Sequence, residues 1–84
     1  MDVLNKIEKS ENYLSDLGFL NFRVRAHGDL AKIEVTKDDY NKFSDFETRE
    51  KIVKNFKIFG FKFVSLDLLF FNSGSLSRSQ FNEK

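Results

Sequence analysis

Apolar residues near the start of the chain recur at the spacing of an α-helix. They are Val3, Leu4, Ile7, Tyr13, Leu14 and Leu17. Gaps of three and four residues place such side chains on one helical face, and Gly18 follows where a helix end favours a left-handed residue. The pattern predicts an amphipathic helix over residues 2–17.

The pattern then changes to the period of two that is typical of half-buried strands. Two runs alternate apolar with polar residues, and their apolar members are Phe22, Val24, Ala26, Ala31, Ile33 and Val35. Between the runs, Gly28-Asp29 suits a two-residue type II′ turn. Counting outward from this turn places each of these six residues opposite another of the six, for example Val24 opposite Ile33. We therefore expect a hairpin with one apolar face and one charged face.

A short helical turn and a longer helix are expected next. Thr36 with Asp39 three residues later is the pattern of a capping box and predicts the turn. Ser44 or Asp45 is expected to cap the longer helix, and Gly60 to end it. The apolar stripe of this helix is Phe46, Ile52, Val53, Phe56 and Phe59.

A third strand is predicted over residues 61–70, with Val64, Leu66 and Leu68 facing one way. LGF at 17–19 and FGF at 59–61 each join a helix to a strand, 42 positions apart, and form a weak internal repeat. The order helix–strand–strand–helix–strand predicts an α+β fold. It is an α/β sandwich whose helices pack on one face of a small mixed three-stranded sheet. We expect one domain over residues 1–76 and a polar, disordered tail over residues 77–84.

The composition narrows the classes of function. The 84 residues include eleven Phe but no Cys, which excludes disulfides, thiolate metal sites and cysteine nucleophiles. With one His and no evident carboxylate pair, we expect no enzyme activity and no bound cofactor in this chain alone. The longest apolar run, residues 64–71, is too short to span a bilayer, and we expect a cytoplasmic protein.

Nucleic acid is an unfavourable partner for this composition. The formal net charge is +1, far from the basic balance of a general nucleic-acid binder. RNA binding through the basic strand face, with Phe61 and Phe63 exposed beside it, would therefore neutralise few phosphates.

The charged face of the hairpin holds the candidate site. In the predicted register Arg23 lies opposite Glu34, and Arg25 lies opposite Lys32, with His27 two residues further along. Like charges directly across a sheet are destabilising by up to ~1 kcal/mol. A carboxylate or phosphate ligand would relieve this repulsion and suits the planar fork of arginine.

The charged face also fits two hypotheses that need no ligand. The solvent-facing side of an antiparallel sheet commonly carries charge without any binding role. In addition, Asp67 on the matching face of the third strand could neutralise the cations internally.

The same residues resemble a known family. RVRAHGDLAKIEV, residues 23–35, resembles the R-V-R-x-H-x-x-x-A-R-I-E-V pattern in the C-terminal domain of LarE-type enzymes, which are ATP-dependent sacrificial sulfur transferases of the PP-loop superfamily. FGFKFVSLDLLFFNSGSL, residues 59–76, resembles the family's L-G-F-x-x-V-T-L-D-L-x-G-Y-R-S-G-S-M. The resemblance implies a non-catalytic module that binds an anionic nucleotide-like substrate, assembles with a PP-loop ATP-binding domain or subunit, or does both.

The resemblance also implies roles for single residues. The anion- or substrate-binding candidates from the charged face and the motifs are Arg23, Arg25, His27, Lys32, Ser73, Gly74 and Ser75. Glu34 and Asp67 match acidic positions of the family, and that of Glu34 is associated with metal binding. A lone glutamate opposite an arginine fits a salt bridge better than a metal ligand, so we predict no metal site.

The chain also departs from the family. It has no S-G-G-x-D-S loop and no cysteine, so we expect no sulfur transfer by this chain alone. It is expected to be either a piece of a longer protein or a relative that works with partner subunits. Where the family has Gly-Tyr-Arg, this chain has Phe70-Phe71-Asn72 and so lacks an arginine. The alternative function is a protein-interaction or homo-oligomerisation domain that uses Leu69, Phe70 and Phe71, unless these residues complete a thin core.

Overall fold

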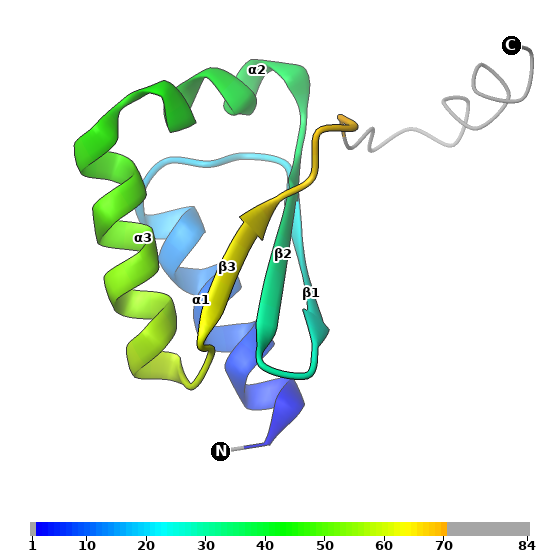
Figure 1. Cartoon of the computed structure of the whole chain (residues 1–84). Helices are drawn as coiled ribbons and strands as arrows, with labels where there is room; N and C mark the ends of the chain where they lie inside the picture. Colours follow the sequence, from blue (N-terminus) through cyan, green and yellow to red (C-terminus); the bar gives the residue numbers. More distant parts are fainter. Residues whose placement is uncertain (1, 71–84) are drawn as a thin grey trace, which may run out of the picture.

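In the computed structural model, which describes residues 2–70, helices and strands follow in the expected order (Figure 1). The elements are α1 (Val3–Asp16), β1 (Phe22–His27), β2 (Leu30–Val35), α2 (Lys37–Tyr40), the 3₁₀ helix η1 (Asn41–Ser44), α3 (Phe46–Phe59) and β3 (Phe63–Leu66). Neither α1 nor any other helix within residues 2–70 is both long and apolar enough to cross a membrane.

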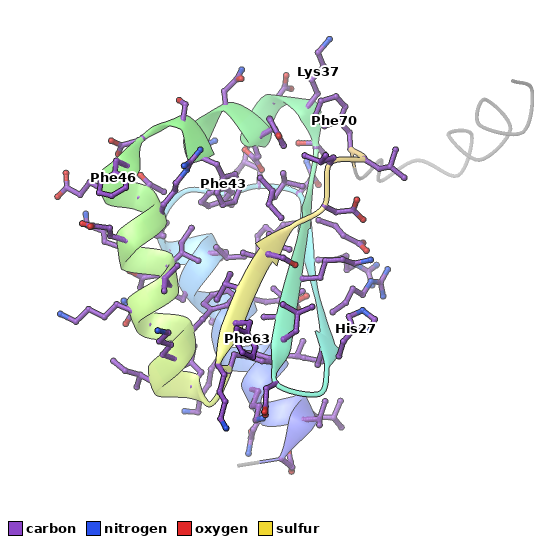
Figure 2. All side chains as sticks on the ribbon, viewed as in Figure 1. His27, Lys37, Phe43, Phe46, Phe63 and Phe70 are labelled. Carbon is purple, nitrogen blue, oxygen red and sulfur yellow. The ribbon has the colours of Figure 1, made fainter. Side chains whose placement is uncertain are left out.

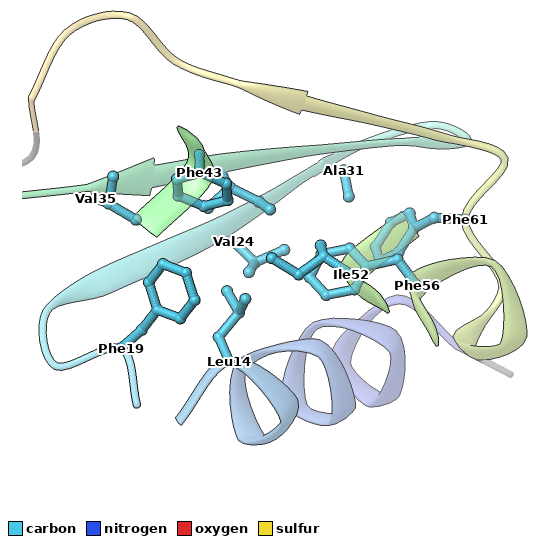
Figure 3. Packing of buried hydrophobic residues seen from close by; sticks show 10 residues of the cluster. Leu14, Phe19, Val24, Ala31, Val35, Phe43, Ile52, Phe56 and Phe61 are labelled. Atoms are coloured by element: carbon cyan, nitrogen blue, oxygen red, sulfur yellow. The ribbon is translucent and has the colours of Figure 1, made fainter. Parts of the chain in front are cut away.

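The strands form one mixed sheet in the order β1-β2-β3, in which β1 pairs with β2 antiparallel and β2 pairs with β3 parallel. Both α1 and α3 lie on the same side of the sheet, and the buried side chains fill the space between (Figure 3). These residues are Leu14, Phe19, Val24, Ala31, Ile33, Val35, Phe43, Ile52, Phe56 and Phe61. The α+β fold with helices on one face of a mixed sheet is confirmed.

The hairpin has the register that its apolar pattern requires. Phe22 pairs with Val35, and Val24 pairs with Ile33. Gly28, the first residue of the turn, has φ +60°. Within residues 2–70 no residue other than glycine has a positive φ, so φ of Asp29 is negative. A type II′ turn needs this combination. A slip by one residue would turn the apolar set of one strand toward water, and this fixes the register.

The two helix–strand junctions have the same local structure. Gly18 and Gly60 follow α1 and α3 with φ of +102° and +118°. After each glycine, the next N–H donates to a carbonyl in the last turns of the helix: Phe19 to Leu14 at 3.1 Å and Phe61 to Phe56 at 3.0 Å. The internal repeat therefore corresponds to a repeated helix end.

The expected capping box at Thr36 is wrong. Thr36 is the N-cap of α2, but its side chain makes no capping hydrogen bond. The carboxylate of Asp39 instead points into the fold, where it accepts hydrogen bonds from Leu20 and Asn21. Two backbone donors there satisfy the carboxylate better than one N-cap amide would.

The apolar stripe of α3 is narrower than expected. Asp45 is its N-cap residue, but the Asp45 side chain makes no capping hydrogen bond to the backbone and instead accepts the Thr48 hydroxyl at 2.8 Å. Ile52 and Phe56 are buried, and Phe59 is partly buried. Phe46 is 68% exposed and Val53 is 38% exposed. Since each residue advances 100° around a helix, both side chains lie roughly 100–120° away from the buried stripe. Phe46 points outward from the start of α3 (Figure 2).

The third strand is shorter than the prediction. It covers Phe63–Leu66, with Val64 and Leu66 partly buried on the core side, and Leu68 beyond it is 77% exposed. The strand stops because Asp67 Oδ1 accepts the N–H of Leu69 at 3.0 Å, and this local bond bends the chain. The predicted end of the domain at residue 76 and the tail over residues 77–84 lie outside the described residues.

Candidate functional site

The charged face of the hairpin becomes the helix-free face of a three-stranded sheet. Because residues of one face recur every two positions, the register aligns them in rows across the strands. One row is Arg25, Lys32 and Ser65, the row toward the turn is His27, Leu30 and Phe63, and Arg23 pairs with Glu34 on the other side. We call these side chains, together with Asp67, the open sheet face.

Acidic side chains of the domain lie between its cations. Glu34 contacts Arg25 Nε through Oε1 at 3.3 Å and Lys32 Nζ through Oε2 at 3.7 Å. The Lys32 ammonium also lies 3.5 Å from Asp67 Oδ2. The repulsion between Arg25 and Lys32 is therefore offset within the domain, as the internal-neutralisation hypothesis expects.

The Arg25 side chain of the open sheet face stays accessible to solvent after this neutralisation. The Arg25 side chain is 49% exposed, whereas that of Glu34 is 16% exposed. Solvent-exposed ion pairs contribute only about 0–1 kcal/mol, so an anionic ligand could compete for the guanidinium at small cost.

An aromatic surface adjoins the charges at the turn end of the face. Phe63 is 63% exposed and aligns with Leu30 and His27, while Figure 2 shows Phe63 on β3 and His27 at the end of β1. Phe61 does not share this surface, since it is 1% exposed in the core. The expectation that Phe61 and Phe63 are exposed together is therefore wrong for Phe61. Pairing of β2 with β3 is what places Phe63 here, and strand order was not readable from the hydrophobic pattern.

Two further sequence predictions concern the serine–glycine motif and the metal. Ser73, Gly74 and Ser75 lie outside the described residues. Within residues 2–70, no group of three or more His, Asp or Glu side chains is arranged to hold a metal ion.

The buried carboxyl of Asp39 has a lowered pKa, and its role is structural. It is 2% exposed; Oδ2 accepts the N–H groups of Leu20 and Asn21, at 2.8 and 3.1 Å, and Oδ1 accepts Lys42 Nζ at 2.7 Å. Burial raises the pKa of this carboxyl, but the hydrogen bonds from Lys42 and the two backbone groups outweigh it, so the pKa lies below its ordinary value of 3.8. The carboxylate therefore holds the loop before β1 in place.

Comparison with known proteins shows what this chain is similar to. No family model matches it. It is 36% identical over 76 residues, or 90% of its length, to the pyridinium-3,5-bisthiocarboxylic acid mononucleotide synthase of Lactiplantibacillus plantarum, a LarE enzyme. It is also 35% identical over 78 residues to an uncharacterized protein of Synechocystis and 39% identical over 73 residues to one of Methanocaldococcus jannaschii.

The similarity is extensive for this chain but partial for its relatives. The matched segments cover 87–93% of the chain and only 27–29% of the three relatives, so the chain spans less than a third of their length. The resemblance to LarE enzymes is thus confirmed at the level of one segment. The chain is an α+β domain that is similar to this segment of a LarE enzyme.

Proposed function

We propose that this module binds part of an anionic nucleotide-like substrate on its open sheet face and works together with a PP-loop ATP-binding domain. The observation that carries the proposal is the similarity of 90% of the chain to a segment of a synthase whose name specifies a mononucleotide with acid groups. The ATP-dependent chemistry itself is assigned to the partner domain, since this chain lacks the PP-loop signature.

The open sheet face offers a group for each part of such a ligand. The guanidinium of Arg25 can exchange Glu34 for a phosphate or carboxylate and hold it with two parallel hydrogen bonds. Lys32 supplies a point charge beside it. The exposed ring of Phe63 can stack on a heteroaromatic ring, and a positively charged pyridinium would add a cation–π contribution.

Nuclear magnetic resonance titration of the ¹⁵N-labelled chain tests this proposal. Nicotinate mononucleotide is expected to shift the signals of Arg25, Lys32 and Phe63 at millimolar concentration, whereas inorganic phosphate should affect the two cations alone. Arg25→Gln should weaken binding, and Lys54→Gln on α3 is the matched control because it removes a positive charge away from the open sheet face. No shift at these three residues with nicotinate mononucleotide, phosphate or ATP would reject the proposal.

A second candidate function is a protein-interaction or oligomerisation domain without a small ligand. It is favoured by adjacent apolar residues after β3: Leu68 and Leu69 are 77% and 66% exposed. Phe70, 38% exposed, contacts the Tyr40 ring edge-on at 5.3 Å, while Phe71 lies outside the described residues. Sedimentation of Leu69→Ser beside the parent chain tests this candidate. A parent chain that stays monomeric at high concentration would remove the homo-oligomer.

A further inference from the structure

The outer edge of β3 presents backbone groups for pairing. The N–H of Phe63 donates to the Asp29 carbonyl at 3.1 Å, and the N–H of Asp67 donates to the Ile33 carbonyl at 2.9 Å. Because backbone direction alternates along a strand, the amides of Val64 and Leu66 point the opposite way, to the outer edge. Within residues 2–70, no hydrogen bond crosses that edge.

The other edge of the sheet is treated differently. There, Glu11 of α1 reaches the edge of β1, and its Oε2 accepts the N–H of Val24 at 3.0 Å. A helix side chain thus satisfies an amide that would otherwise be open to another strand. In the described part of the chain, β3 has no equivalent of Glu11.

An apolar cavity adjoins the open edge. It has a volume of about 240 Å³, and its lining residues are Ile33, Phe43, Arg49, Ile52, Val53, Val64, Ser65 and Leu66. Core side chains of the central strand β2 are almost fully covered, with Ile33 at 1% exposure, but Val64 and Leu66 of β3 are only partly buried. The core is therefore less complete at the β3 edge than at the central strand.

The rim of this cavity on α3 is basic. A shallow hollow shares Arg49 and Val53 with the cavity, and its further lining residues are Phe46, Glu50, Lys54 and Lys57. Three cations against one acid favour a partner with acidic side chains at this rim.

We infer that the β3 edge binds an extended polypeptide segment as a fourth strand. Its apolar residues, at every second position, enter the cavity between α3 and β3, and its acidic residues face the basic rim of α3. Main-chain hydrogen bonds to Val64 and Leu66 supply affinity, and the cavity and rim supply specificity. This site does not include Arg25 or Lys32, so the inference does not rest on nucleotide binding.

Amide hydrogen exchange of the whole chain tests the inference. The probe is a nine-residue peptide of alternating glutamate and valine with acetylated and amidated ends. It is expected to slow exchange of the Val64 and Leu66 amides by about tenfold or more, and to leave the already paired amides of Phe63 and Asp67 unchanged. Unchanged exchange at Val64 and Leu66 with saturating peptide would overturn the inference.

Charge reversal on the basic rim distinguishes specific peptide binding from non-specific association. The double variant Lys54→Glu with Lys57→Glu should bind the glutamate–valine peptide roughly tenfold more weakly than the parent chain does. It should bind a lysine–valine peptide more tightly instead. Lys51→Glu, also on α3 but not part of the rim, is the control and should change neither affinity. Equal effects of both variants would contradict the assigned rim.

A second copy of the chain is the competing occupant. Slowed exchange at Val64 and Leu66 in peptide-free samples, together with a concentration-dependent dimer in sedimentation, would assign the edge to self-association and overturn the peptide partner. A chain that stays monomeric while the peptide protects these two amides supports the inference.

Discussion

The chain contains two helix–glycine–strand units, α1–Gly18–β1 and α3–Gly60–β3. Both hold the start of their strand in the same geometry but with different chemistry. Before β1, the N–H groups of Leu20 and Asn21 donate to one carboxylate oxygen of Asp39, at 2.8 and 3.1 Å. The residues 42 positions later are Lys62 and Phe63. Their N–H groups also donate to one oxygen, again at 2.8 and 3.1 Å, but this oxygen is the backbone carbonyl of Asp29.

This difference shows how one backbone arrangement can depend on the sequence to different degrees. The acceptor of the first unit is a side chain, so a mutation can remove it and acid can protonate it. The acceptor of the second unit belongs to the main chain and is insensitive to both. We therefore expect the unit of α1 and β1 to be the one that pH and substitution can loosen selectively.

The largest effects should come from the equivalent buried positions Leu14 and Phe56, both 0% exposed. Phe56→Ala is expected to lower the free energy of unfolding by about 3–5 kcal/mol and Leu14→Ala by about 2–5 kcal/mol, since each leaves a cavity in the core. Urea denaturation measures both, with Ile58→Ala on the exposed face of α3 as the control. A loss below about 1 kcal/mol for either one would mean that its unit does not contribute to the common core.

Removal of the side-chain acceptor should have the next largest effect. Asp39→Ala leaves the Leu20 and Asn21 amides without their acceptor and is expected to cost about 3 kcal/mol. Asp39→Asn keeps one oxygen for the two amides and should cost less. A cost for Asp39→Ala no greater than that of a surface substitution would contradict the role of this carboxylate.

Acid should act on the same group. Because the folded pKa of Asp39 lies below its ordinary value of 3.8, its contribution to stability is complete above that value and is lost as pH falls through the lowered folded pKa. Exchange of the Leu20 and Asn21 amides should then accelerate in acid relative to Lys62 and Phe63. Asp39→Asn should remove this part of the pH dependence. If acid accelerated exchange of both amide pairs equally, the selective acid sensitivity of the unit of α1 and β1 would be contradicted.

Substitution of the two helix-ending glycines should have a smaller effect. Alanine at either position must adopt a positive φ, which is expected to lower the free energy of unfolding by about 1–2 kcal/mol for each substitution. A Cβ at Gly18 meets no atom within 4 Å, whereas at Gly60 it lies 2.9 Å from Cε of Lys6. Gly60→Ala should therefore cost more, because Lys6 must leave its position 5.3 Å above the Phe61 ring. In a Lys6→Ala background the two glycine substitutions should become equal in thermal denaturation.

Ser10 should give the smallest effect. It is 0% exposed, and its hydroxyl finds no hydrogen-bond partner within the described residues, while the equivalent position of the second unit is the buried Ile52. Ser10→Ala removes an unpaired polar group and favours the helix, so we expect a change between zero and about 1 kcal/mol of stabilisation. Calorimetry that shows clear destabilisation would indicate that the hydroxyl has a partner.

The sequence predicts best where local chemistry and burial agree. The hairpin register follows from Gly28-Asp29 and the alternation of apolar residues, and both helix ends follow from Gly18 and Gly60. The apolar stripe of α3 was only partly predictable, because Phe46 has the right chemistry but lies on the wrong side of the helix.

The remaining features depend on contacts between distant parts of the chain. Asp39 has the spacing of a capping residue, but its partners Leu20 and Asn21 lie in a loop that only the fold brings near. On the open sheet face, the register places Glu34 opposite Arg23, yet its carboxylate contacts the side chains of Arg25 and Lys32. Register fixes backbone pairs, whereas long side chains choose partners among several neighbours.

The carbonyl of Asp29 gives the hairpin turn a second task. A two-residue turn is usually where a ribbon tolerates added residues most easily, and the strands on either side continue to pair. Here the turn also anchors the first amides of a strand that arrives more than thirty residues later. A loop inserted at this turn would leave β1 and β2 paired while it detaches β3. The turn is therefore a poor site for a fusion tag and a good site for an inserted domain that controls the docking of β3.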